Sequence, residues 1–292
     1  MKIGWIGTGI MGLSMSGHIQ ANGHELFVFN RTKNSAEPLL AKGACWCDSP
    51  ADVAARSEVL FTIVGLPEDV EDIYFGENGI FSVEGDCRIV VDMTTSRPSL
   101  AKMISRKAED KGIDSLDAPV SGGDVGAKAG TLAIMVGGRR NIFHKVLPLF
   151  QLMGQDISFM GGPGAGQNTK MCNQILVAGT MIGVCESLLY ASKLGLDQDA
   201  VIRIIGKGAA GSWSINNLGP RIVKGDYEPG FIVNHFIKDM RIALEEATEV
   251  GLSLPGLGLV CQLYLAVKAQ GHGCSGTQAL FIALESLNGG RL

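Results

Sequence analysis

The N-terminal glycine motif constrains the fold of this chain more than any other segment. Gly7, Gly9 and Gly12 form a GxGxxG sequence. The motif follows an apolar run at Lys2–Ile6 that has the composition of a buried strand, and a helical pattern follows the motif. A strand, a glycine-rich turn and a helix start in this order are typical of a dinucleotide-binding βαβ unit. The alternative is a glycine-rich turn without a ligand.

Each glycine has a separate expected role in such a unit. Gly7 permits the tight turn, Gly9 lets the backbone approach a pyrophosphate, and Gly12 allows the helix to pack closely on the strand. The N–H groups at the helix start would bind the phosphates. The residues expected to contact the dinucleotide in this segment are Gly7, Thr8, Gly9, Ile10, Met11 and Gly12.

Short apolar runs alternate with helix-length segments through the first half of the chain. This alternation predicts a doubly wound, mainly parallel sheet. We expect strands at Lys2–Ile6, Leu26–Phe29, Val59–Val64, Arg88–Asp92, Ser115–Ala118, Thr131–Val136 and Ile157–Met160, and helices at Met11–Asn22, Pro67–Phe75 and Ser99–Lys111.

The pattern changes after a glycine cluster at residues 161–166. From Gln167 to about Leu194 the chain has no proline, which predicts a helix roughly 40 Å long at 1.5 Å per residue. Every later segment has a helical pattern. A length of 292 residues is too great for one typical domain. We therefore expect an α/β Rossmann-like N-terminal domain, residues 1–163, joined by this long interdomain helix to an all-α C-terminal domain, residues 164–292.

Composition argues against several other classes of protein. The net charge is −4 and there is no basic run, so the positive surface that nucleic acid requires is missing. Polar residues interrupt the apolar runs, which we expect to fall short of a membrane span. Seven cysteines without a CxxC pair, and no signal peptide before the first strand, predict reduced thiols and a cytoplasmic location. The five histidines lack ligand spacing, and we expect no metal.

The end of the second predicted strand bears on the choice of cofactor. An NAD-preferring site usually has Asp or Glu there to bind the ribose 2′-hydroxyl. This chain has Asn30, Arg31 and Thr32 instead. A guanidinium can pair with a 2′-phosphate that a carboxylate would repel. We expect NADP(H) to be preferred and NAD(H) to be possible. Alternatively, Arg31 is a solvated surface residue.

Two more loops follow predicted strands of the same sheet. Val64, Leu66 and Pro67 belong to the first loop, and Asp92–Ser96 forms the second. Ligands of such sheets bind at the carboxyl ends of the strands, so both loops are candidates to line the ribose and nicotinamide. Each could also be an ordinary turn.

A further turn offers donors for an anion. Ser121, Gly122 and Gly123 follow another predicted strand, and a hydroxyl with neighbouring backbone N–H groups can form a concave anion site. The site would suit the carboxylate of a small substrate. A plain glycine turn is the alternative.

One face of the long predicted helix is unusually polar. Lys170, Asn173 and Gln174 are spaced by three and four residues, so they share a face of an otherwise apolar helix. A lysine near a helix start is by itself usually a solvated residue.

Four motifs in this order resemble the β-hydroxyacid dehydrogenase family. That family includes 3-hydroxyisobutyrate dehydrogenases, tartronate semialdehyde reductases and glyoxylate/succinic semialdehyde reductases, and more distantly 6-phosphogluconate dehydrogenase. The motifs are Gly7–Gly12, Asp117–Gly123, Gly164–Asn173 and Lys238-Asp239, and together they cover the chain from residue 4 to about 250.

The resemblance implies a role for several residues. Lys170 would be the catalytic acid/base in a cleft between the two domains, and Thr95 would line the nicotinamide side. Ser121, Gly122 and Gly123 would hold the substrate, while Lys238 would lie near the cofactor and the substrate carboxylate. Many members have Asn four residues after the lysine. This chain has Asn173 followed by Gln174, as tartronate semialdehyde reductases do, so which amide contacts substrate stays open.

The expected reaction is reversible reduction of a small carboxylate-bearing aldehyde, with Lys170 moving the proton. Tartronate, methylmalonate and succinic semialdehydes and glyoxylate are the candidate substrates. Imine reductases share the fold but usually lack the lysine, and a non-catalytic dinucleotide-binding member would be expected to lose the lysine or the Ser121 turn. We also expect a homodimer or homotetramer, because helical domains of this kind often bury an apolar face against a partner.

Overall fold

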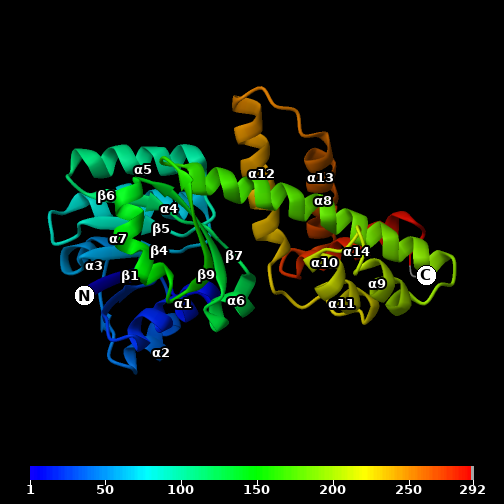
Figure 1. Cartoon of the computed structure of the whole chain (residues 1–292), viewed down its shortest axis with the longest axis horizontal. Helices are drawn as coiled ribbons and strands as arrows, with labels where there is room; N and C mark the ends of the chain where they lie inside the picture. The colour runs from blue at the N-terminus through cyan, green and yellow to red at the C-terminus, as the bar shows by residue number, and fades with distance from the viewer. Residues whose placement is uncertain (291–292) are drawn as a thin grey trace. The chain divides into compact units, whose positions relative to one another are not determined.

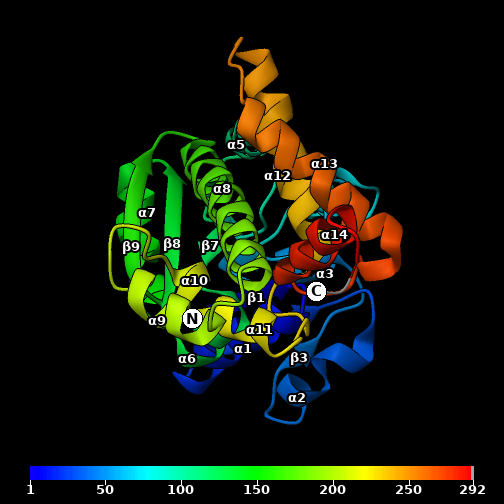
Figure 2. The same cartoon turned by 90° about the vertical axis from the view of Figure 1, so that its right-hand side faces the viewer.

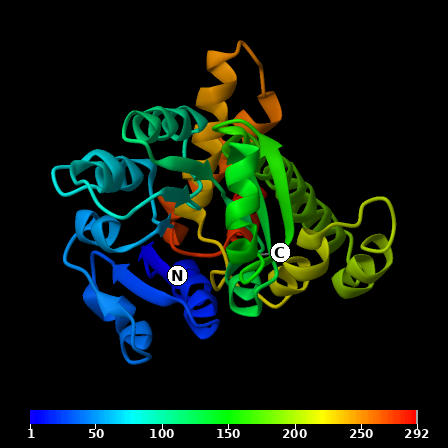
Figure 3. The ribbon, with the colours of Figure 1, turned by 60° about the vertical axis from the view of Figure 1, so that its left-hand side comes forward.

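The computed structural model describes residues 1–290, and the chain divides into two compact units, Met1–Lys170 and Met171–Leu292. The first unit carries the sheet, and Figure 3 turns this unit toward the viewer. Its strands are β1 (Lys2–Ile6), β2 (Glu25–Phe29), β3 (Cys45–Trp46), β4 (Val59–Thr62), β5 (Ile89–Asp92), β6 (Asp114–Asp117), β7 (Val120–Ser121), β8 (Leu132–Gly138) and β9 (Gly154–Gly161).

The strands form a doubly wound sheet, which confirms the predicted α/β class. Their order is β3-β2-β1-β4-β5-β6-β8-β7, with β9 beside β8. The pairs from β3 to β6 are parallel, whereas β8 runs antiparallel to β6 and β7. The first unit's helices are α1 (Ile10–Ala21), α2 (Glu37–Leu40), α3 (Pro50–Arg56), α4 (Pro67–Phe75), α5 (Pro98–Asp110), α6 (Gly123–Ala129) and α7 (Arg140–Phe150), drawn in Figure 1.

Alternating side chains place one apolar core on each face of the sheet. Trp5 and Phe61 stack in the core that also contains buried residues of α1 and α7. Leu60 and Val90 point to the opposite core, which contains buried residues of α3, α4 and α5. Because both faces are covered, the central strands are apolar on both sides, as the continuous apolar runs in the sequence indicated.

The parallel register aligns four strand ends in one row. Ile6 of β1 pairs with Thr62 of β4, Thr62 pairs with Asp92 of β5, and Asp92 pairs with Asp117 of β6. The glycine motif and three of the loops singled out in the sequence follow these four residues directly. The carboxyl edge of the sheet therefore collects the predicted functional loops of the first unit.

The second unit is helical, and Figure 2 turns it toward the viewer. Its elements are α9 (Gln198–Ile205), α10 (Trp213–Asn217), α11 (Gly219–Val223), α12 (Val233–Glu249), α13 (Pro255–Val267) and α14 (Leu280–Leu287), together with most of α8 (Ala165–Lys193). Met181, Leu188, Phe236 and Tyr264 are fully buried members of one core. The predicted long helix and the helical second half are confirmed.

Several details differ from the sequence expectation. The two-residue strands β3 and β7 were not predicted, because so short a run carries no periodic signal. The strand expected at Val59–Val64 ends at Thr62, and the strand expected at Ile157–Met160 extends over Gly154–Gly161. These limits are decided by pairing with neighbouring strands rather than by local composition.

Helix α8 also corrects one expectation. By length and composition alone it could cross a membrane, so the expectation that every apolar run falls short of a span is wrong for this helix. Ala178, Met181 and Leu188 are buried in the core of the helical unit, as expected for a core helix, which passes the same test.

Candidate active site

The glycine motif has the geometry that a dinucleotide cradle requires. Gly7 has φ +95°, and a Cβ there would press on the backbone of Ile63. Gly9 faces open space, with no atom within 4 Å of a Cβ position, so a phosphate can reach its backbone. A Cβ on Gly12 would collide with the carbonyl oxygen of Gly7. The three glycines therefore differ in the way their separate predicted roles demand, and the cradle fits a pyrophosphate.

Asn30 holds the glycine loop from the neighbouring strand. Its Oδ1 accepts a hydrogen bond from the backbone N of Thr8 at 3.0 Å, and its Nδ2 donates to the carbonyl of Thr32 at 2.9 Å. Arg31 is different, because its side chain is 90% exposed and lies 3.6 Å from Asp69 at the start of α4. Asn30 thus supports the loop, while the Arg31 guanidinium is available to a ligand.

Four further predicted cofactor residues of the first unit lie near the loops that follow β1 and β4, and Pro67 lies with them. Ile10 is 74% exposed at the start of α1, whereas Met11 is half-buried. Val64 donates its backbone N–H to Thr94 Oγ1 at 3.0 Å, which ties the loop after β4 to the loop after β5. Leu66 is exposed directly before α4, and Pro67 begins that helix.

A buried polar group lies under these loops. Asp92, at the end of β5, is 3% exposed, and its Oδ1 accepts hydrogen bonds from Thr62 Oγ1 at 2.8 Å and Thr94 N at 3.1 Å. Tyr74 OH lies 3.2 Å from Thr62 Oγ1. Asp92 Oδ2 has no hydrogen-bond partner among the described residues. Burial raises the pKa of Asp92 to about 6, although these hydrogen bonds oppose the shift.

Asp117, in the same row, holds the first turn of α8. Its Oδ1 accepts from Gly164 N at 2.8 Å and its Oδ2 accepts from Gln167 N at 2.9 Å. A carboxylate at a helix N-terminus is favoured by the free N–H groups and by the helix dipole. Gly166 permits the close approach, since a Cβ there would lie 2.6 Å from the Asp117 carbonyl oxygen. Burial still raises the pKa of Asp117 above its usual value.

Lys170 lies one turn beyond these contacts and is only 7% exposed. A buried lysine is unusual, so the alternative of a solvated helix-start lysine is wrong. The predicted anion turn lies in the same unit, and its first residue, Ser121, follows Asp117 by four positions. Ser121 ends β7 and is half-buried, and Gly122 and Gly123 have φ of +130° and +62°, which side-chain-bearing residues rarely adopt.

Three predicted residues belong to the second unit and form a chain of polar contacts there. Asn173 Nδ2 donates to Gln174 Oε1 at 2.7 Å, and Gln174 Nε2 donates to Asp239 Oδ2 at 2.6 Å. The ammonium of Lys238 lies 2.9 Å from Asp239 Oδ1. Gln174 and Asp239 are both buried. Lys238 and the polar face of α8 are therefore linked through one carboxylate.

Sequence reasoning did not assign Asp92, Gln167 or Asp239 to the site. Asp92 and Asp239 carried a visible signal, since each is an acidic residue within a segment already singled out, the Asp92–Ser96 loop and the Lys238-Asp239 motif. Gln167 lies within the Gly164–Asn173 motif, but nothing local indicated its contacts, because its partners at residues 94 and 96 are more than 70 positions away. No cluster of potential metal ligands occurs among residues 1–290, the part of the chain that the structure describes.

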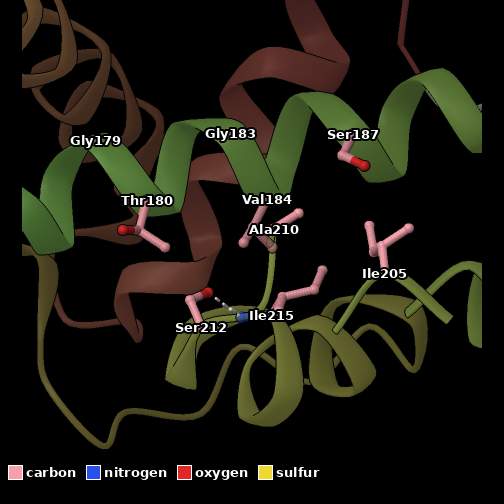
Figure 4. Close-up of a pocket in the computed structure, with 9 residues that line it drawn as sticks. All are labelled: Gly179, Thr180, Gly183, Val184, Ser187, Ile205, Ala210, Ser212 and Ile215. Carbon is pink, nitrogen blue, oxygen red and sulfur yellow. Dashed lines mark hydrogen bonds between the residues drawn. The ribbon is translucent and has the colours of Figure 1, made fainter. Parts of the chain in front are cut away.

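A pocket in the helical unit is separate from these residues. It has a volume of about 260 Å³ and lies between α8 and the segments around α9 and α10 (Figure 4). Its lining residues are Gly179, Thr180, Gly183, Val184, Ser187, Ile205, Ala210, Ser212 and Ile215. None of them was predicted to act in binding or catalysis, and none carries an ionisable side chain.

Comparison with known proteins assigns the chain to a family. Residues 2–162 match the NAD binding domain of 6-phosphogluconate dehydrogenase, and residues 164–284 match the domain described as NAD-binding of NADP-dependent 3-hydroxyisobutyrate dehydrogenase. The chain belongs to the β-hydroxyacid dehydrogenase family. As a member, it is an NAD(P)-dependent oxidoreductase that acts on hydroxyacids.

Individual relatives of this β-hydroxyacid dehydrogenase are similar to it over nearly its whole length. A probable mitochondrial 3-hydroxyisobutyrate dehydrogenase-like protein 1 of Arabidopsis thaliana is 52% identical, covering 98% of this chain and 86% of the relative. The 2-hydroxy-3-oxopropionate reductase of Escherichia coli K12 is 39% identical, and the match covers 98% of this chain and 97% of the reductase. The solved 3-hydroxyisobutyrate dehydrogenase of Mycobacterium tuberculosis with L-serine has a TM-score of 0.87 at 28% identity, covering 97% and 98%.

Proposed function

We propose that this dehydrogenase reduces a small carboxylate-bearing aldehyde to its hydroxyacid with NADPH, and that Lys170 supplies the proton. The candidate substrates are tartronate, methylmalonate and succinic semialdehydes and glyoxylate. Relatives named 3-hydroxyisobutyrate dehydrogenase and 2-hydroxy-3-oxopropionate reductase support this substrate class.

The burial and anchoring of Lys170 carry the proposal. A 7% exposed lysine must have its amine held by the protein, because burial of an unsupported ammonium is costly. The helix that bears it is tied by its first turn to Asp117 and to the loop on either side of Thr95. An amine fixed in this way, in the same unit as the glycine cradle, is suited to proton transfer at a defined point.

The remaining residues would bind and orient the substrate. A bound NADPH supplies the hydride to the carbonyl carbon. Lys170 donates a proton to the developing alkoxide oxygen in reduction and takes the hydroxyl proton in oxidation. The Ser121 hydroxyl and the backbone N–H groups of Gly122 and Gly123 would hold the carboxylate. Asn173 and Gln174, next on the same face of α8, would add neutral hydrogen-bonding groups.

The preference for NADPH over NADH is proposed from the end of β2. No carboxylate occupies this position. Asn30 stands there instead, and its side chain is hydrogen-bonded to the backbone of Thr8 and Thr32. The exposed Arg31 guanidinium can pair with a 2′-phosphate. Its contact with Asp69 at 3.6 Å is weak and exposed, so a phosphate would readily replace it.

Exposed apolar side chains and the cysteines bear on the proposed assembly and location. Leu176 and Tyr190 of α8 are 73% and 68% exposed, and Trp213 is 69% exposed, which supports a homodimer or homotetramer that covers apolar surface of the helical unit. All seven cysteines are unpaired, which supports a reducing compartment such as the cytoplasm.

Substitution of Lys170 tests the proposed chemistry. Lys170→Ala is expected to lower kcat with NADPH and succinic semialdehyde by about 10²–10⁴-fold, the usual effect of losing a general acid. The Kd for NADPH, measured by calorimetric titration, is expected to stay within about twofold. Lys193→Ala, at the exposed end of the same helix, is the matched control and is expected to leave kcat unchanged. If Lys170→Ala retained more than half of the wild-type kcat, Lys170 would not be the proton donor.

A further inference from the structure

Both polar atoms of the Gln167 side chain are hydrogen-bonded to one loop of the first unit. This side chain is fully buried, and its Nε2 donates to the carbonyl of Thr94 at 2.7 Å. Its Oε1 accepts from the backbone N of Ser96 at 3.0 Å. The amide thus binds the backbone immediately before and immediately after Thr95, in the way that a neighbouring strand would.

The same residue is also fixed from its own backbone. The N–H of Gln167 donates to Asp117 Oδ2, while the other carboxylate oxygen holds Gly164. Three segments that are distant in sequence therefore meet at Gln167: the loop after β5, the end of β6 and the first turn of α8. Each of these segments leads within a few residues to a group of the proposed site, namely Thr95, Ser121 and Lys170.

Geometry makes this junction more than a general packing contact. Gln167 precedes Lys170 by three residues, which is less than one turn and about 4.5 Å along a rigid helix axis. A shift of the helix start relative to the Thr95 loop would move the Lys170 amine by a similar distance. Misplacement of a reacting group by about 1 Å can lower a rate by about 10²-fold.

We propose that Gln167 is a positioning residue that sets the place of Lys170 relative to Thr95 on the nicotinamide side. This inference rests on the proposed role of Lys170. We expect the paired hydrogen bonds of Gln167 to Thr94 and Ser96 to affect kcat and to leave the Kd for the cofactor nearly unchanged.

Two variants separate positioning from simple stability. Gln167→Met keeps the length and volume but removes both side-chain hydrogen bonds. Gln167→Glu keeps an acceptor for Ser96 N, but its carboxylate cannot donate to the Thr94 carbonyl until it is protonated. The nearby Asp117 and Asp92 carboxyls disfavour the charged form of the new glutamate, whereas Lys170 favours it. Gln20→Met is the control, because Gln20 also donates to two backbone carbonyls, those of Leu39 and Lys42, in the same unit.

Steady-state kinetics with NADPH and succinic semialdehyde, NADPH titrations and thermal melts provide the test. Gln167→Met is expected to lower kcat by about 10–10²-fold while the Kd for NADPH changes less than about twofold. Gln20→Met is expected to keep kcat even if its Tm falls. The kcat of Gln167→Glu, taken relative to wild type at each pH, is expected to rise as the pH falls and the glutamate becomes a donor.

The outcomes distinguish this inference from the proposed function. If Lys170→Ala is inactive but Gln167→Met retains wild-type kcat, Gln167 does not position the lysine and the proposed function stands. If Lys170→Ala retains activity, the proposed function fails first. If Gln167→Met does not fold, the folded Gln167→Glu variant decides, and a relative kcat that does not change with pH would overturn the inference.

Discussion

The buried carboxyl of Asp92 makes the stability of this protein depend on pH in a direction that can be calculated. Its pKa is raised from an ordinary 3.8 to about 6 in the folded state. Between these two values the folded chain binds a proton that the unfolded chain does not bind. Asp92 therefore contributes stability below about pH 4, and this contribution is lost as the pH rises through about 6.

The magnitude follows from the shift of about 2 pKa units. Each unit corresponds to about 1.4 kcal/mol, so the change across the window is about 3 kcal/mol in the free energy of unfolding. Asp92→Asn should remove this dependence. The asparagine retains an oxygen that accepts from Thr62 and Thr94, and its neutral amide carries no charge at any pH.

Urea unfolding of wild type and Asp92→Asn at several pH values is the appropriate assay. Trp5 is fully buried and stacked on Phe61 in the first unit, with ring centroids 5.4 Å apart, so its fluorescence reports this unit. The variant should gain about 3 kcal/mol relative to wild type between about pH 4 and about pH 7. Asp226→Asn is a sign control, because the pKa of Asp226 is lowered to about 2 by Arg221. Parallel pH profiles for wild type and Asp92→Asn would refute the reasoning.

Three further predictions concern the cofactor and the substrate. Arg31→Ala should raise the KM for NADPH about tenfold to a hundredfold and change the KM for NADH little, since a charge-assisted pair is lost; equal changes would show that Arg31 does not bind the 2′-phosphate. Butyraldehyde should have a far lower kcat/KM than succinic semialdehyde, because it has no carboxylate to pair with the donors of the Ser121 turn. Each buried donor left without a partner costs about 1–3 kcal/mol. Comparable kcat/KM values for the two aldehydes would show that this turn does not bind a carboxylate. Gly12→Ala should lower Tm and weaken the binding of both NADPH and NADH, because its Cβ would collide with the Gly7 carbonyl. Gly17→Ala in the same helix has room for a Cβ and should have neither effect. Equal effects in the two variants would contradict this prediction.

Local sequence signals predicted much of the first unit. The glycine motif has the turn, the open backbone and the close packing that its three positions implied, because each of these properties requires a residue without a side chain. The helix at Pro67–Phe75 was predicted at its observed limits, since proline at a first helical position is a strong start signal. The buried central strands were visible as nearly continuous apolar runs.

Signals that depend on distant partners were weaker or missing. The reversal of direction at β8 and the pairing of β9 with it could not be deduced, because an apolar run has the same composition in either direction. Lys170 was singled out by its motif, but its burial came only from the fold.

The amino-acid sequence predicted the alternation of strands and helices in the first unit, the long helix, the phosphate-binding turn and the family to which the lysine motif belongs. Those features are encoded in residues that are neighbours along the chain. Only the tertiary structure placed Thr62, Asp92 and Asp117 in one row and joined Gln167 to residues 94 and 96. Such contacts form between segments that are far apart in sequence, and burial then changes the chemistry of the groups involved. The raised pKa of Asp92 results from desolvation, which no local sequence pattern records.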